Sequence, residues 1–325
     1  MSKPVFLITG SMGCIGAWVI RHLLDDDAHI IATDLSTTIT RPALLSSDAE
    51  LKNIKWNALD VTDSSAVTKM VKEKAVTHII HLAGLQIPFC KSNPSLGAAV
   101  NVTGTVNILQ AARESGVSGI CYASSLAALG DDVQYPVKPV TDDVHLLPKT
   151  LYGVYKAANE GTAKVFWHDW QVGSIGLRPY CVYGVARDQG MTADLAKAIL
   201  AIAANKPFHI RFSGQVALQH ASDVARIFID SAYASHQGAA TCNLRGDVIN
   251  VEDFVATLKR LYPQAQITCE KNKSLPFPSD LDDSGLRSIL GNLPHTPLEE
   301  AIKADVYRFS KLITQGNIDL SQLNR

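Results

Sequence analysis

Apolar residues in this chain fall into two patterns that alternate along the sequence. Short, nearly unbroken apolar runs have the length of strands buried on both faces of a parallel sheet. These runs occupy residues 6–9, 29–34, 77–84 and 119–125, and a more polar strand begins at Ile54. Between the strands, apolar residues recur every three or four positions, which predicts helices over 15–24, after the cap residue Asp63, over 94–115 and from Tyr152 to Asp169.

This alternation of strands and helices predicts an α/β fold with a doubly wound parallel sheet. Right-handed crossovers then place helices on both faces, and ligands bind at the carboxyl ends of the strands. After residue 184 the pattern becomes less regular. It predicts helices around 193–205, 251–261 and 298–314, with a strand near 209–212.

Three glycines spaced three apart stand between the first strand and the first helix. Gly10 suits a tight turn, Gly13 lets the backbone approach a pyrophosphate, and Gly16 lets the helix pack closely on the strand. Asp34 ends the second strand about twenty residues later, where a carboxylate binds an adenosine ribose. The stretch therefore predicts dinucleotide binding. A carboxylate repels a 2′-phosphate, so NAD is favoured over NADP, although Arg41 follows in a nearby loop.

Composition excludes several other classes of protein. The 30 basic and 31 acidic residues leave a formal charge of −1, which gives no support for binding nucleic acid or an anionic membrane surface. The six cysteines form no CxxC pair, so we expect reduced thiols and no metal site. No apolar run is long enough to span a bilayer and no signal peptide is evident, so a cytoplasmic location is expected.

Tyr152 and Lys156 lie four residues apart at the start of a predicted helix, on one face. A nearby ammonium group favours the phenolate of a tyrosine, which lets the phenol exchange a proton with a substrate. Ser125, at the end of the neighbouring strand, can hold the substrate oxygen by a hydrogen bond. In an arbitrary protein the same spacing is usually an exposed aromatic residue beside a solvated lysine. Behind a nucleotide-binding turn, the chemical interpretation is favoured.

The order of these motifs resembles the extended short-chain dehydrogenases/reductases, in particular the NAD-dependent epimerase/dehydratase group. The resemblance covers nearly the whole chain. The motifs that carry it are Gly10-x-x-Gly13-x-x-Gly16, Asp34, Asp60-Val61, His81-Leu-Ala-Gly84, Asn101-x-x-Gly104-Thr105, Ser124-Ser125, Tyr152-x-x-x-Lys156, Leu177-Arg-Pro-x-x-Val-Tyr-Gly184 and the closing Thr296-Pro-Leu-Glu-Glu-Ala-Ile.

The resemblance implies roles for individual residues. Tyr152 would be the acid/base, Lys156 would hold the nicotinamide ribose and tune Tyr152, and Ser125 would donate to the substrate oxygen. The implied cofactor-binding set is Gly10, Met12, Gly13, Cys14, Ile15, Gly16, Asp34, Asp60, Val61, Leu82, Ala83, Gly84, Asn101, Tyr152, Lys156 and Pro179. It also implies a Rossmann-type NAD-binding domain over 1–184 and a lobe over 185–325 that mainly binds substrate, with some segments returning to the first domain. Family members commonly form homodimers through a four-helix bundle, here built from helices 96–115 and 152–169.

Two positions depart from the nucleotide-sugar epimerases of this group. Cys181 stands where those enzymes have an asparagine, and Val216 where they have an arginine four residues before the histidine matched by His220. Both family residues contact a diphosphate, so their loss favours a substrate without a nucleotide. A smaller change is Leu129 in place of an aromatic residue. The candidate substrate-binding residues are Gln86, Ser125, Arg187, Gln189 and His220.

Three functions follow from these residues. The first is an NAD-dependent dehydrogenase that removes a hydride from a carbohydrate-type hydroxyl of a free sugar, sugar acid or similar polyol. The second is an NAD-dependent epimerase of a sugar or nucleotide sugar that acts through a transient keto intermediate, with the same three side chains. The third is a catalytically silent NAD-binding protein, which is disfavoured because both Tyr152 and Lys156 are present.

Overall fold

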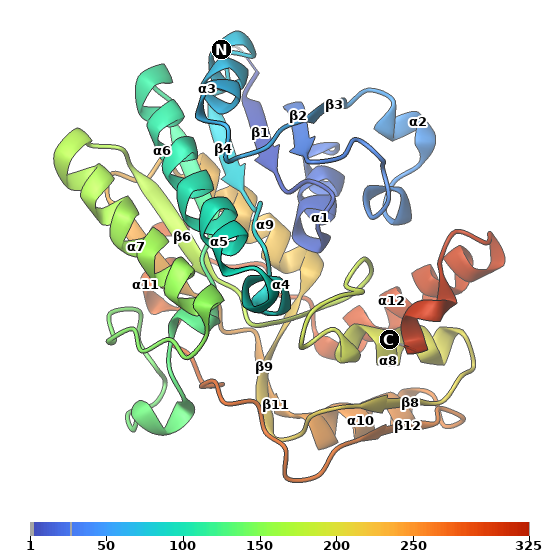
Figure 1. Ribbon diagram of the computed structural model, residues 1–325. Coiled ribbons are helices and arrows are strands. Elements are labelled where there is room, and N and C mark those ends of the chain that lie inside the picture. The colour runs from blue at the N-terminus through green and yellow to red at the C-terminus, as the bar shows by residue number, and fades with distance from the viewer. Residues whose placement is uncertain (1–2, 27, 325) are drawn as a thin grey trace.

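The computed structural model describes residues 3–26 and 28–324. Its centre is a sheet of seven parallel strands in the order β10-β6-β5-β4-β1-β2-β3 (Figure 1). The strands are β1 (Val5–Thr9), β2 (His29–Asp34), β3 (Lys55–Ala58), β4 (His78–His81), β5 (Gly119–Ala123), β6 (Ser174–Arg178) and β10 (Ala239–Asn243). The predicted doubly wound parallel sheet is confirmed.

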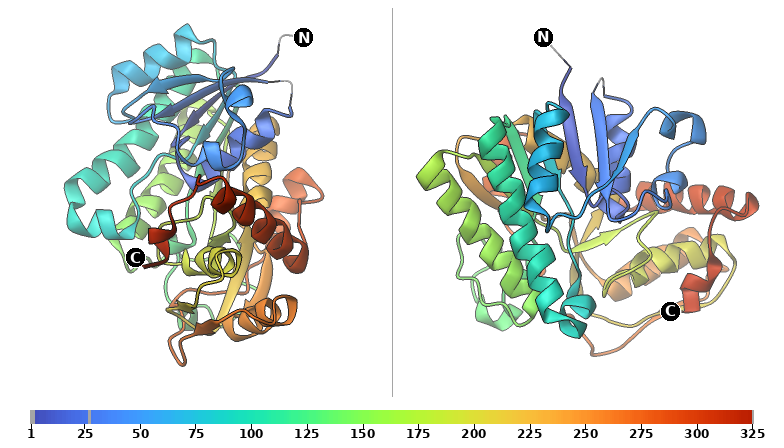
Figure 2. Two further views of the ribbon diagram at one scale, coloured as in Figure 1. Left: turned by 90° about the vertical axis from the view of Figure 1, so that its right-hand side faces the viewer. Right: turned by 45° about the horizontal axis from the view of Figure 1, so that its top comes forward.

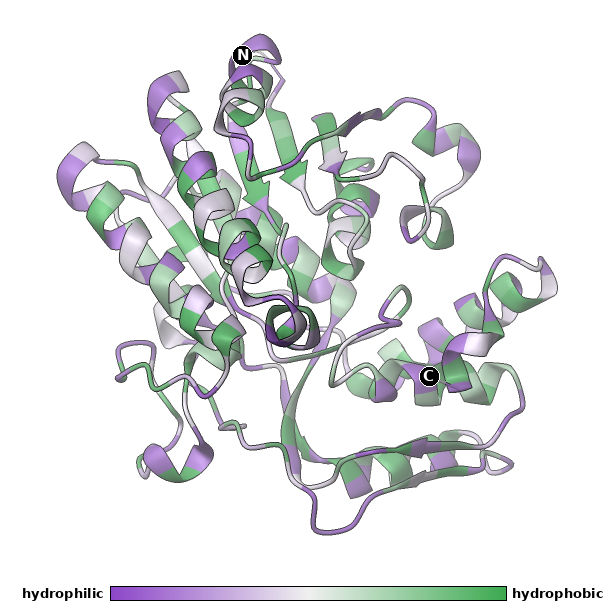
Figure 3. Cartoon of the chain, in the orientation of Figure 1, coloured by the Kyte–Doolittle hydropathy of each residue, from purple (hydrophilic) through white to green (hydrophobic). Residues whose placement is uncertain are grey.

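Side-chain alternation along each strand fills a separate core on either face of the sheet. Leu7 packs with helices α3 (Ser64–Glu73), α6 (Gly104–Ser115) and α7 (Leu151–Trp170), together with Ile31, Ile79 and Ile120 from neighbouring strands. The adjacent residues Phe6 and Ile8 point the other way, toward α1 (Cys14–Leu23) and α9 (Ala221–Tyr233). This period of two explains why the strands are apolar throughout. Figure 2 shows the two helical layers, and Figure 3 shows the apolar strands between them.

The chain reverses its order in the sheet between β1 and β4. From β1 it moves outward to β2 and β3, then returns to β4 on the other side of β1. Ligands of doubly wound sheets bind at such a switch point, beyond the carboxyl ends of the strands. The glycine turn follows β1 and residues 82–84 follow β4, so both segments lie at this position.

The helix predicted over 94–115 is interrupted by a short π-helical segment. It consists of α5 (Pro94–Ala98), a π-helical segment (Ala99–Thr103) and α6, which ends at Gly116 in the left-handed conformation. In the π-helical segment, the backbone carbonyl of Asn101 accepts hydrogen bonds from two side chains, Thr105 Oγ1 at 2.8 Å and Asn159 Nδ2 at 2.9 Å. Periodicity did not predict this segment, because Asn159 comes from a distant part of the chain.

A smaller lobe lies below the sheet in Figure 1. Strands β7 (Cys181–Tyr183), β9 (Gln215–His220) and β11 (Asp247–Asn250) form one sheet, and β8 (Phe208–Ile210) pairs with β12 (Ile267–Cys269). Its helices are α8 (Asp194–Ala203), α10 (Val251–Leu261) and α12 (Leu298–Thr314), whereas α11 (Ser284–Leu290) lies against β10 of the central sheet. Helix α9 and strand β10 leave the lobe and complete the central sheet. The sequence predicted α8, α10 and α12, but not α9.

Short elements complete the chain. They are η1 (Pro42–Leu44), α2 (Asp48–Leu51), α4 (Ile87–Ser92), η3 (Leu126–Ala128), η4 (Asp132–Gln134) and η5 (Leu320–Asn324). Helix α2 begins with a capping box in which Ser47 and Glu50 satisfy each other's backbone N–H groups. Among the helices of the described residues, none combines the length and the apolarity that crossing a membrane requires.

Candidate active site

The glycine turn has the conformation that a phosphate-binding loop requires. Gly10 has φ +70, and a Cβ there would lie 2.7 Å from the Ala83 nitrogen, so a side chain is excluded. A Cβ on Gly16 would lie 2.4 Å from the Gly10 carbonyl oxygen. Gly13 caps α1 in an extended conformation, and among the described residues other than its chain neighbours only the Gly10 oxygen, 3.1 Å away, comes within 4 Å of its Cβ position. The turn therefore leaves room for a pyrophosphate at the start of α1.

Asp34 lies at the end of β2, beside this turn. Its Oδ2 accepts a hydrogen bond from the Met12 backbone nitrogen at 3.0 Å, and its Oδ1 accepts from the Leu35 nitrogen at 2.8 Å. The carboxylate is thus held at the edge of the glycine turn, the position expected for a group that binds the adenosine ribose.

A cavity of about 800 Å³ extends from the glycine turn to the small lobe. Its wall contains Gly10, Gly13, Cys14, Ile15, Gly16, Leu82, Gly84, Tyr152, Lys156 and Pro179 of the predicted cofactor-binding set. The other predicted members, Met12, Asp34, Asp60, Val61, Ala83 and Asn101, are not among the residues that line it. Asp60 is exposed and accepts from Thr62, while Val61 is buried against the position of Gly104.

Ser125, Tyr152 and Lys156 come together in the cavity from two elements. Thr150 caps α7 by accepting from the Gly153 nitrogen at 3.0 Å, which places Tyr152 in the first turn of the helix. One turn later, the Lys156 Nζ lies 5.5 Å from the centre of the Tyr152 ring and donates to the Ala123 carbonyl at 2.7 Å. Ser125 follows β5, lines the same cavity and lowers the pKa of the Tyr152 phenol through its hydroxyl.

Burial controls the charges of these groups. It raises the pKa of Tyr152 above its usual value, while the hydrogen bond with Ser125 and the positive charge of Arg187 act in the opposite direction. Burial lowers the pKa of Lys156 to about 8. Without a further positive charge the phenol stays protonated near neutral pH, so a cationic ligand ring beside it would favour proton release.

Asn101 has a buried side-chain oxygen that no described residue satisfies. Its Nδ2 donates to the Gly97 carbonyl at 2.9 Å, whereas its Oδ1 is buried and accepts no hydrogen bond from the described residues. That oxygen lies 2.8 Å from the position that a Cβ on Gly84 would take. The missing side chain at Gly84 leaves a path from the cavity to Asn101 and Lys156. The residues present therefore fit a dinucleotide with its ribose close to Gly84.

The predicted substrate residues Gln86, Arg187 and Gln189 also line this cavity. Arg187 and Gln86 converge beside Gly190. A Cβ on Gly190 would lie 2.9 Å from Arg187 Nη2 and 3.0 Å from Gln86 Oε1. Arg187 Nη2 also approaches Thr192 Oγ1 at 3.4 Å. Its Nε is buried without a hydrogen-bond partner, and Arg187 forms no ion pair with any other described residue.

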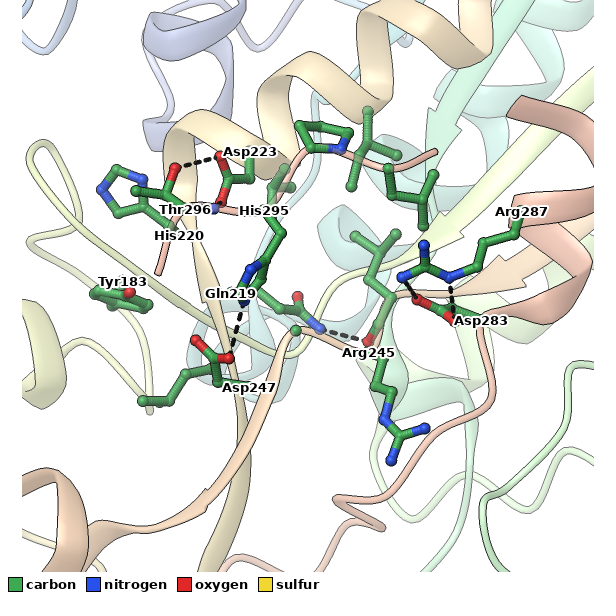
Figure 4. A pocket seen from close by; sticks show the side chains of 17 residues that line it. Tyr183, Gln219, His220, Asp223, Arg245, Asp247, Asp283, Arg287, His295 and Thr296 are labelled. Carbon is green, nitrogen blue, oxygen red and sulfur yellow. Dashed lines mark hydrogen bonds and ion pairs between the residues drawn. The ribbon is translucent and has the colours of Figure 1, made fainter. Parts of the chain in front are cut away.

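His220 lies elsewhere, on the wall of a second cavity of about 90 Å³ (Figure 4). It is buried against the rings of Trp18 and Tyr183, with Nε2 3.4 Å from Asp305 Oδ2. The structure does not bring it together with Tyr152. Charged groups around this second cavity pair with one another, as in His295 with Asp247 at 2.9 Å and Arg287 with Asp283 at 2.9 Å.

Sequence reasoning missed several residues of the larger cavity. Lys197 and Arg211 line it from the small lobe, and Gln322 reaches it from η5 near the end of the chain. Arg211 is paired with the buried Asp194 at 2.6 Å. Lys197 lies on the inner face of α8, where an otherwise apolar helical stripe contains one lysine. The lysine in an apolar stripe could have been found from the sequence, whereas no local pattern identifies Gln322 as a cavity residue.

Together the fold and the cavity define a protein of the dinucleotide-binding class, with the Tyr152 phenol on the wall of the same cavity as the glycine turn. Residues 6–244 match the model of the NAD dependent epimerase/dehydratase family. The chain belongs to this NAD-dependent family. The resemblance found in the sequence is confirmed.

Curated relatives share part of the chain. An uncharacterised protein of Methanocaldococcus jannaschii is 31% identical over 191 residues, covering 57% of this chain and 58% of the relative. A UDP-glucose 4-epimerase of Mycolicibacterium smegmatis is 27% identical over 207 residues, covering 62% of this chain and 65% of the relative. The chain thus spans well under two thirds of the length of the first of these relatives.

Solved structures match the fold over most of the chain. An L-threonine dehydrogenase from Clostridium difficile has a TM-score of 0.82 at 21% identity, covering 96% of this chain and 99% of that one. The UDP-glucose 4-epimerase of Thermotoga maritima has a TM-score of 0.81 at 21% identity, covering 95% and 99%. At this identity the similarity establishes the fold and leaves the substrate open.

Proposed function

We propose that the protein is an NAD-dependent dehydrogenase that oxidises a hydroxyl of a small carbohydrate-type substrate, such as a free sugar, a sugar acid or a similar polyol. The observation that carries this proposal is the convergence of Ser125, Tyr152, Gln86 and Arg187 on one cavity. Residues 1–184 then mainly bind the cofactor and residues 185–325 mainly bind the substrate.

In this proposal Ser125 and Tyr152 hold the substrate hydroxyl, and Tyr152 takes its proton as the carbon loses a hydride. NAD, when bound, is the hydride acceptor. Lys156 remains beside the phenol and stabilises its anionic form by its charge. The products are a carbonyl compound and a protonated Tyr152, which returns its proton to solvent before the next turnover.

The substrate side of the cavity favours a compact polar molecule. Cys181 and Val216, which replace two diphosphate-binding residues of the nucleotide-sugar epimerases, are both fully buried and offer no charge to a ligand. Arg187 has a guanidinium without a carboxylate partner among the described residues. It suits a substrate carboxylate or vicinal hydroxyls, because charge-assisted hydrogen bonds are strong in a partly desolvated site.

A sugar epimerase is the second candidate. It is favoured by the sequence similarity to the UDP-glucose 4-epimerase of Mycolicibacterium smegmatis and by a cavity large enough for a substrate beyond the cofactor. An epimerase would use the same side chains but would return the hydride, so NADH would not accumulate.

The test follows absorbance at the NADH band with purified protein, added NAD and a panel of compounds. The panel contains free aldoses, sugar acids, L-threonine and nucleotide sugars. A rise with a free sugar or acid supports the dehydrogenase and identifies the substrate class. No rise, together with an isomerised nucleotide sugar, contradicts it and supports the epimerase.

We also propose a homodimer formed through α6 and α7. On α7, Val154, Ala158, Gly161 and Val165 are exposed and follow one another at helical spacing on one face. A Cβ on Gly161 would meet nothing within 4 Å, so a partner helix can approach closely there. A stripe of small and apolar residues on a surface helix is typical of helix pairing between subunits.

A further inference from the structure

The loop after β7 presents Arg187 and Gln189 to the cavity, and its backbone is unusual. Gly184 has φ +125, Ala186 has φ +75 and Gly190 has φ +104. Positive φ is unfavourable for alanine, because its Cβ crowds the following carbonyl. The loop therefore needs contacts from outside to hold this conformation.

Two side chains from the predicted cofactor-binding domain form hydrogen bonds with this loop. Trp18, on the helix that follows the glycine turn, donates from Nε1 to the Val185 carbonyl at 2.9 Å. Arg41 donates to Asp188 from Nε at 2.8 Å and from Nη2 at 3.1 Å. Both partners are partly buried, with side-chain exposures of 22% and 34%, so this is a charge-assisted, two-pronged contact.

Arg41 also reaches the glycine turn itself. Its Nη1 donates to the Met12 carbonyl at 2.8 Å, while the Met12 nitrogen donates to Asp34 at 3.0 Å. Met12 thus lies between the carboxylate expected at the adenosine ribose and the arginine that holds the loop. A continuous series of hydrogen bonds connects Asp34 through Met12 and Arg41 to Asp188, the immediate neighbour of Arg187.

We propose that the Arg41–Asp188 pair couples cofactor binding at the glycine turn to the ordering of the loop that carries Arg187. NAD that immobilises Met12 then holds Arg41, which holds Asp188 and positions Arg187 before substrate arrives. By linkage, an ordered loop strengthens cofactor binding in return. Arg41 and Asp188 are positioning residues in this account. The inference rests on the proposed placement of Arg187 at the substrate.

The experiment measures amide hydrogen exchange of the segment 185–193 with and without NADH, and the dissociation constant of NADH by titration. In the wild type we expect NADH to slow exchange by about fivefold or more, the lower end of typical coupling. In Asp188→Asn and in Arg41→Gln the slowing should fall below about twofold, and NADH should bind about fivefold more weakly. The double variant should bind NADH no more weakly than either single variant, since one pair is lost in all three.

A matched control is Asp280→Asn, which breaks the Arg245–Asp280 pair away from this cavity at an aspartate whose exposure, 32%, is close to that of Asp188. It should leave both readouts at the wild-type values. The proposal would be overturned if NADH protected the segment 185–193 equally in the wild type and in the Arg41 and Asp188 variants. It would also be overturned if the loss of NADH affinity in the double variant equalled the product of the losses in the two single variants. Neither readout needs a substrate. A panel without turnover would therefore overturn the proposed function and leave this test intact.

Discussion

At the scale of single residues, the phenol of Tyr152 is the group with the most demanding environment in the cavity. Its ring is half-buried and lies 5.5 Å from the Lys156 Nζ, and the Ser125 hydroxyl and the charge of Arg187 both act on the pKa of the phenol. Burial favours the neutral phenol and outweighs the opposing effects of Ser125 and Arg187, so the pKa of Tyr152 is raised and the phenol stays protonated until a further positive charge lies beside it.

Removal of the Tyr152 hydroxyl tests its proposed role. Tyr152→Phe should lower kcat by several orders of magnitude, because proton transfer alone contributes about 10²- to 10⁴-fold and substrate orientation adds to it. NADH affinity, measured by titration, should remain within about twofold. The control is Tyr155→Phe, one turn of α7 away, which loses only a hydrogen bond to the Pro94 carbonyl. Retained activity in Tyr152→Phe would mean that another group handles the proton.

Asp142 makes stability depend on pH. Burial raises the pKa of its carboxyl to about 6, although Asn243 donates to it from the backbone at 2.6 Å. A carboxyl with a raised pKa in the folded state stabilises the protein below its ordinary pKa, and this contribution is lost as pH rises through about 6.

The variant Asp142→Asn carries no charge at any pH, so it should be more stable than wild type at pH 7.5 and about equal to it at pH 4. Because the side chain is only half-buried, solvent screens the effect, and we expect about 1 kcal/mol. Urea unfolding at both pH values measures the difference. A constant difference between the two proteins across this range would contradict the raised pKa.

At the scale of secondary-structure elements, a buried ion pair connects α7 to β6 and β5. Glu160, one turn after Lys156, accepts from Arg178 Nη2 at 2.8 Å and from Ser124 Oγ at 2.5 Å. Both charged side chains are almost completely buried, with exposures of 3% and 2%. The pair therefore fixes α7 relative to the strand ends and holds Ser125 and Lys156 at their relative positions.

Glu160→Gln would leave the Arg178 charge buried without a counterion. Loss of one partner of a buried pair costs about 3–5 kcal/mol, which should appear as a reduced free energy of unfolding in urea. Glu114→Gln is the matched control, because it removes an exposed pair with Lys72 and should cost at most about 1 kcal/mol. Equal losses in the two variants would show that the buried pair has no special role in joining these elements.

At the scale of the whole molecule, the proposed dimer depends on the exposed stripe of α7. Val165→Glu places a charge in the middle of that face, where a partner helix would bury it, so we expect a monomer by light scattering coupled to size-exclusion chromatography. Val133→Glu introduces the same change at a valine that is 86% exposed in the short helix η4, outside α6 and α7, and should leave the dimer intact. Identical masses for both variants and wild type would remove this interface from consideration.

Local signals were sufficient for the sheet and for its helices other than α9. The glycine triplet, Asp34 and the Tyr152–Lys156 spacing each depend on backbone conformation within a few residues, and helical or strand periodicity depends on the faces that become buried. The sequence alone thus predicted the doubly wound fold, the dinucleotide turn and the family.

Only the tertiary structure decided how distant segments meet. Arg41 and Asp188 are 147 positions apart, Gln322 enters the cavity from the end of the chain, and His220 lies in a different cavity from the one its motif suggested. The π-helical segment at Asn101 depends on a side chain from α7. Contacts of this kind depend on how packed elements approach one another, and no periodicity in the sequence records that approach.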